Sequence, residues 1–95
     1  MSSWLTTRRL RVTSKRLGAL REELRVIDEQ AMYLGDDAAE AELRAMVSES
    51  PMARSEAREA GGHAAAMARH RAHVVGRIAE LEVELDRLLD QLGSG

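Results

Sequence analysis

The chain of 95 residues has no cysteine and no phenylalanine, and it has only one tryptophan and one tyrosine. Without cysteine, neither a disulfide framework nor a thiolate metal site is available. The shortage of aromatic residues disfavours a sheet-based core and a deep ligand pocket, because both rely on such side chains. These absences leave a helical protein as the simplest architecture.

Long apolar runs and a strong charge imbalance are also missing. No stretch of about 18 apolar residues occurs, so we expect no membrane-spanning helix. Residues 1–9 lack the apolar stretch of a signal peptide, and a cytoplasmic location is expected. The net charge is only −2 although 32% of the residues are charged, which disfavours a generic nucleic-acid binder.

What the sequence does have is two apolar series whose members are mostly three or four residues apart. Such spacing places the side chains on one side of a helix, and that side must be buried against another helix. We therefore predict an all-α fold, a long antiparallel coiled-coil helical hairpin. The first series is Leu10, Leu17, Leu20, Leu24, Ile27, Ala31 and Leu34, and the second is Met67, Val74, Ile78, Leu81, Leu85, Leu88 and Leu92.

Capping signals suggest a single domain, residues 1–95, with helices over about 6–34, 37–48 and 51–92. Thr6 or Thr7 is a candidate N-cap for the first helix. Ser50 followed by Pro51 is a typical start signal for the last helix, and the glycines after residue 92 would stop it.

Glycines mark the weakest part of the predicted hairpin. Gly35 occupies the position of a C-cap glycine, and Asp37 with Glu40 resembles a capping box that begins a new helix. Folding the chain at residues 48–51 places Gly35 near Gly61-Gly62, so a joint is predicted there, as a kink, bulge or hinge. In the alternative, residues 36–49 pack as a separate helix in a three-helix bundle.

The distal part of the predicted hairpin uses smaller side chains than its base. We expect Ala53, Ala57, Ala60 and Ala64 to pack against a face that carries Ala39, Leu43, Met46 and Val47. Because small residues bury less area, at about 25 cal/mol per Å², the distal half is predicted to be the less stable part.

A second apolar set, here called the outer stripe, recurs every seven residues, away from the first series. A two-helix hairpin would leave it in water, and exposed apolar stripes usually mark an interface. We expect self-association into a homodimer or another helical bundle, or docking onto a partner helix. The outer stripe is Leu5, Val12, Ala19, Val26 and Tyr33, of which Leu5, Val12, Val26 and Tyr33 are the candidate interface residues.

Charged clusters offer further candidate contacts. The basic start, with Arg8, Arg9, Arg11, Lys15 and Arg16, could contact phosphates, but we expect it to pair with Glu80, Glu84, Asp86 and Asp90. The candidate acidic contact is Asp36, Asp37, Glu40 and Glu42.

No catalytic motif, nucleotide loop or complete metal-ligand set occurs in the sequence. His63, His70 and His73 are interpreted as surface side chains, since no further ligand completes a closed zinc site. We therefore predict a non-enzymatic interaction module without catalytic residues, metal or cofactor.

Two short segments, residues 63–65 and 76–82, resemble the second coiled-coil helix of Gre-type transcript cleavage factors. The resemblance covers about 20 residues, a few turns of helix. It implies an accessory protein that presents an acidic arm to RNA polymerase. The tip motif of that family is missing, and Asp36 and Asp37 would have to lie at the tip.

Overall fold

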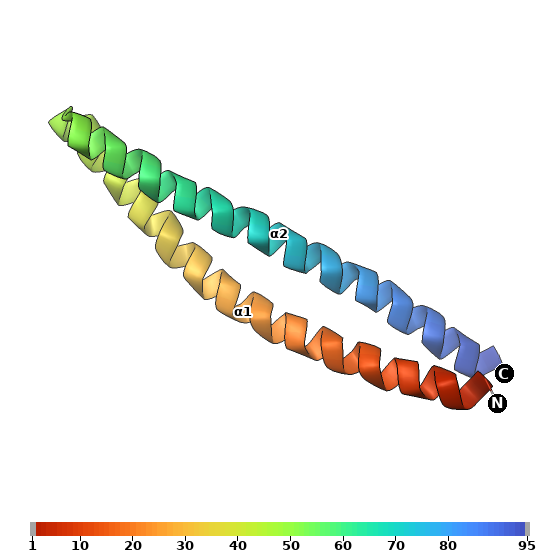
Figure 1. Ribbon diagram of the computed structural model, residues 1–95. Helices are drawn as coiled ribbons and strands as arrows, with labels where there is room; N and C mark the ends of the chain where they lie inside the picture. The colour runs from red at the N-terminus through yellow and green to blue at the C-terminus, as the bar shows by residue number, and fades with distance from the viewer. Residues whose placement is uncertain (1, 95) are drawn as a thin grey trace. The chain divides into compact units, whose positions relative to one another are not determined.

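The computed structural model describes residues 2–94, which form two α-helices and no strand. Helix α1 spans Ser2–Ser48 (47 residues) and helix α2 spans Pro51–Ser94 (44 residues). Figure 1 shows the two helices joined by a short turn. The predicted all-α helical hairpin is confirmed.

The turn between the helices consists of Glu49 and Ser50. Glu49 has a φ of 54°, in the left-handed region, and its backbone N–H donates to the Ala45 carbonyl at 3.1 Å. The hydroxyl of Ser50 accepts a hydrogen bond from the Ala53 N–H at 3.1 Å, which is the geometry of an N-cap. With Pro51 at the first helical position, the predicted start of the last helix is confirmed.

The predicted break after Leu34 is wrong, and so is the separate short helix over 36–49. The helical backbone of α1 continues through Gly35 and Asp37 without interruption. A glycine inside a helix costs only about 1 kcal/mol relative to alanine, so one glycine does not end a helix that packs along its length. Capping residues at this point were therefore a weaker signal than the apolar spacing.

The outer ends of the helices also differ from the prediction. Helix α1 already begins at Ser2, so Thr6 and Thr7 lie inside it rather than at its cap. The Thr7 hydroxyl instead donates to the Ser3 carbonyl at 2.7 Å. Helix α2 continues to Ser94 rather than stopping near residue 92, a difference within the usual range for helix ends. Gly95, part of the predicted stop, lies outside the described residues.

The chain divides into two compact units, but not at the glycines. Unit 1 contains α1 up to Leu24 and α2 from His73, and unit 2 is Arg25–Ala72. Gly61 and Gly62 lie inside continuous helix. A Cβ added at either position would have no described atom within 4 Å, apart from its chain neighbours and the nearby backbone of its own helix. No close approach therefore requires these glycines, and the hinge at this level stays a prediction.

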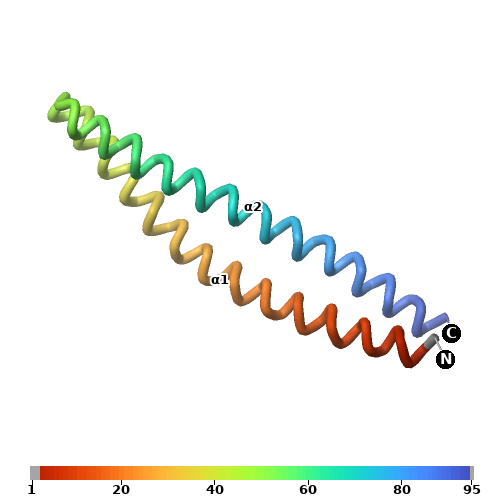
Figure 2. Tube along the Cα trace, viewed as in Figure 1, coloured from red at the N-terminus to blue at the C-terminus, as the bar shows by residue number. Residues whose placement is uncertain are grey.

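In unit 1, the first part of α1 lies alongside the last part of α2 (Figures 1 and 2). Its core consists of large aliphatic side chains, with Leu81 and Leu88 each only 1% exposed. Thr6 and Thr13 of the same unit are buried as well, although neither threonine was predicted to lie in the core. The apolar spacing pointed to both positions, because Thr6 precedes Leu10 by four residues and Thr13 follows it by three.

Unit 2 is a helical hairpin closed by the turn at Glu49 and Ser50. Ile27 and Ala41 are its buried apolar residues, each 3% exposed. Most of the other inward positions are alanines that stay half-buried: Ala31, Ala38 and Ala45 on α1, and Ala53, Ala57, Ala60 and Ala64 on α2.

The predicted inward face of residues 37–48 is therefore wrong. Ala39, Leu43, Met46 and Val47 are all exposed. Because α1 is uninterrupted, the spacing set by its earlier turns continues to Ala41 and turns Leu43 outward. The distal face is thus lined by alanine on both helices.

Candidate functional site

The outer stripe lies on the solvent side of α1 in both units. In unit 1, Leu5 and Val12 are each 50% exposed, and in unit 2 Val26 is 39% and Tyr33 67% exposed. Ala19 is exposed as well. The exposure agrees with the expectation for a two-helix hairpin, and the role of these residues as an interface stays a prediction.

A second group of large apolar side chains is exposed in unit 2 near the turn. Val47 is 80% exposed and Met52 is 72% exposed. Nearby, Leu43 and Val47 line an open groove of about 400 Å³. Sequence reasoning missed this patch because it broke α1 at Gly35; extending the three-and-four spacing past this glycine would have found it. The patch is Leu43, Met46, Val47 and Met52.

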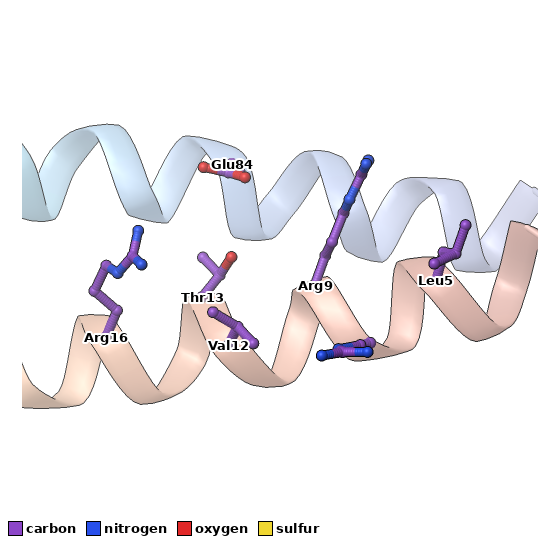
Figure 3. Close-up of a pocket in the computed structure, with 7 residues that line it drawn as sticks. Leu5, Arg9, Val12, Thr13, Arg16 and Glu84 are labelled. Atoms are coloured by element: carbon purple, nitrogen blue, oxygen red, sulfur yellow. The ribbon is translucent and has the colours of Figure 1, made fainter.

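A groove of about 370 Å³ crosses the basic start of α1 in unit 1. Figure 3 shows Arg9 and Arg16 extending from α1 on either side of Thr13, with Glu84 of α2 lying across from them. Three guanidinium groups and two apolar side chains therefore border the same groove, which suits an anionic group attached to an apolar body. The lining is Leu5, Arg8, Arg9, Val12, Thr13, Arg16 and Glu84.

The expected pairing of this basic start with Glu80, Glu84, Asp86 and Asp90 of α2 is wrong. Over residues 2–94, the side chains of Arg8, Arg9, Arg11, Lys15 and Arg16 form no ion pair. The ion pair between these parts of the helices joins Arg21 to Glu82, at 3.1 Å. Glu80 is held instead by Arg77 of its own helix at 3.0 Å. The cations are therefore available to a partner.

The candidate acidic contact lies on α1 in unit 2. Asp36, Asp37, Glu40 and Glu42 are exposed, and within the described chain none of them is ion-paired. Asp37 lies roughly three helical turns before the end of α1. The acidic residue at the turn itself is Glu49, so Asp36 and Asp37 do not form a tip.

The three histidines are exposed on α2. The Nε2 atom of His63 lies 3.7 Å from the Glu59 carboxylate one turn earlier. Among the described residues, no three His, Asp or Glu side chains are grouped so that they could hold a metal ion.

The described parts of both helices contain no apolar segment long enough to cross a membrane.

No protein-family description matches this chain, and comparisons with curated proteins and with solved structures give no match. The residues and geometry described above are therefore the basis for a functional proposal.

Proposed function

We propose that this chain is a non-enzymatic protein–protein interaction module that associates with further copies of itself through the outer stripe of α1. The observation that carries the proposal is the exposure of large apolar side chains at seven-residue intervals, from Leu5 to Tyr33. Single exposed apolar residues are normal on a protein surface. A periodic series on one helix face is instead typical of a helix that packs against another helix.

The energetics of a small helical hairpin support the same conclusion. Two helices of this size bury little core, and small scaffolds commonly gain stability by oligomerisation. Full burial of a valine or leucine side chain contributes about 1.5–3 kcal/mol. Covering half-exposed side chains such as Val12 and Val26 would contribute a smaller amount at each position, and the contributions accumulate along the stripe.

Mass in solution tests this proposal directly. Multi-angle light scattering of the wild-type chain should give a mass above that of the 10.5 kDa monomer. Val26→Glu places a charge in the stripe, so its mass should fall towards the monomer value while circular dichroism still shows a helical protein.

A matched control separates the effect of the substituted position from the effect of the added charge. Ala66 is exposed on α2, outside the outer stripe, and Ala66→Glu adds the same charge to a helix surface. This variant should keep the wild-type mass. A wild-type chain that is monomeric at millimolar concentration contradicts the proposal, and so does an equal effect of both substitutions.

Two other functions from the sequence analysis stay predictions. An acidic arm for RNA polymerase is supported by the exposed carboxylates of Asp36 and Asp37, although these residues are not at the turn. Nucleic-acid binding is supported by the unpaired cations of α1. Glu84, beside those cations, opposes it, because a carboxylate in the groove repels phosphates.

A further inference from the structure

We propose that the cationic patch of α1 in one copy docks onto the acidic patch of α1 in a second copy. The cationic patch is Arg8, Arg9, Arg11, Lys15 and Arg16, in unit 1; the acidic patch is Asp36, Asp37, Glu40 and Glu42, in unit 2. The inference rests on the proposed self-association and specifies which surfaces meet.

The cationic patch has the features of a docking surface. Its five side chains are exposed, and no acidic side chain of residues 2–94 pairs with them. Leu5 and Val12 border the same groove as Arg8, Arg9 and Arg16 (Figure 3). A partner would therefore need carboxylates next to apolar side chains on one helical surface.

The acidic patch of the same chain meets that requirement. Asp36 and Glu40 lie between Tyr33 and Leu43, and both of these apolar residues are more than half exposed. Two series along α1 have the same steps of three, four and three residues. One is Tyr33, Asp36, Glu40 and Leu43, and the other is Leu5, Arg8, Val12 and Lys15. Each series therefore lies along one side of α1, and the charged members of the two series are opposite in sign.

An antiparallel contact between the two α1 helices uses this match. When Leu5 faces Leu43 of the second copy, Arg8 faces Glu40 and Arg11 faces Asp37. Charge also favours the antiparallel direction, since a parallel in-register pairing of the two α1 helices would place like charges next to each other.

Charge favours a second copy over nucleic acid as the occupant. The part of α2 in the same unit carries Glu80, Glu82, Glu84 and Asp86, and Glu84 lines the groove itself. A continuous phosphate backbone would be repelled by these carboxylates. The α1 helix of a second copy carries separate carboxylates, which can contact the cations of α1 without lying against the acidic residues of α2. The net charge of −2 points the same way.

Charge reversal in two variants tests the contact. The first variant, Arg8→Glu with Arg11→Glu, reverses the two cations that face Glu40 and Asp37 of the second copy, and the second, Asp37→Arg with Glu40→Arg, reverses those two carboxylates. Each alone should weaken self-association at least about tenfold, because like charges now face each other. An equimolar mixture of the two should regain the wild-type mass as a mixed complex, since each reversed patch now meets its opposite.

The control is Arg58→Glu with Arg69→Glu, which makes the same change in net charge on exposed positions of α2. It should associate as the wild-type chain does, with circular dichroism showing that all variants stay helical. If the wild-type chain is oligomeric and both patch variants keep its mass, this inference is overturned while the proposed self-association survives. A monomeric wild-type chain whose cationic patch shifts duplex DNA overturns both.

Discussion

The two units of this protein use the same helix pairing with different side chains. Unit 1 is held by large aliphatic residues, with Leu17, Val74, Leu81 and Leu88 at most 2% exposed. In unit 2 most inward positions are half-buried alanines, and only Ile27 and Ala41, each 3% exposed, are fully buried apolar residues. Because burial of apolar area is the main stabilising term, the same architecture is expected to be unequally stable along its helices.

The comparison also separates hydrophobicity from burial. In unit 2, α1 turns small Ala41 inward and large Leu43 outward. The phase of a helix is fixed along its whole length by its 3.6-residue period, so the packing of one part decides which residues face inward in the next. Exposed large side chains in unit 2 are therefore a consequence of continuity, and they are where we expect partners.

The largest expected effect is from a truncation in the core of unit 1. Leu81→Ala removes a side chain that is 1% exposed and should lower the free energy of unfolding by about 3 kcal/mol. Urea denaturation at one protein concentration measures this. Val83→Ala, at a position that is 70% exposed, is the matched control and should change stability by less than about 0.5 kcal/mol. Similar losses for the two variants would show that the core is misplaced.

A smaller effect is expected from enlarging an alanine of unit 2. Ala41 is 3% exposed, so Ala41→Leu must displace the opposite helix, at a cost of about 1–3 kcal/mol. Ala39→Leu, two residues earlier on the exposed side, should be nearly neutral in the same thermal or urea melts. A larger loss of stability for Ala39→Leu than for Ala41→Leu would support the inward face predicted from sequence and contradict the alanine-lined one.

The smallest effect is a stabilisation of unit 2. Replacing Gly61 and Gly62 by alanine improves helix propensity. The added methyl groups would have no described atom within 4 Å, apart from their chain neighbours and the nearby backbone of α2. The double variant should gain roughly 1–2 kcal/mol, and its amides near residue 61 should exchange more slowly with solvent. Gly93→Ala, near the fraying end of α2, is the control and should gain much less. No gain at Gly61 and Gly62 would indicate a bend at this level, as the predicted joint requires.

Most of the fold followed from the spacing of apolar residues. The series from Leu10 and from Met67 predicted two packed helices, and Ser50-Pro51 predicted where the second begins; both are confirmed. The prediction failed at Gly35, where local capping signals were given more weight than the continuing period. The exposure of Leu5 to Tyr33 was predictable because these residues fall outside that period, whereas the patch around Leu43 was missed through the same error.

The sequence by itself determined that this protein is a pair of helices and which side of the first helix is left without a partner, because periodicity encodes a buried side directly. Only the tertiary structure decided that α1 passes through Gly35, that alanines rather than Leu43 face inward, and that the cationic patch of α1 forms no ion pair within the described residues. These properties depend on the phase and pairing of whole helices, and local preferences of about 1 kcal/mol per residue are too weak to fix them.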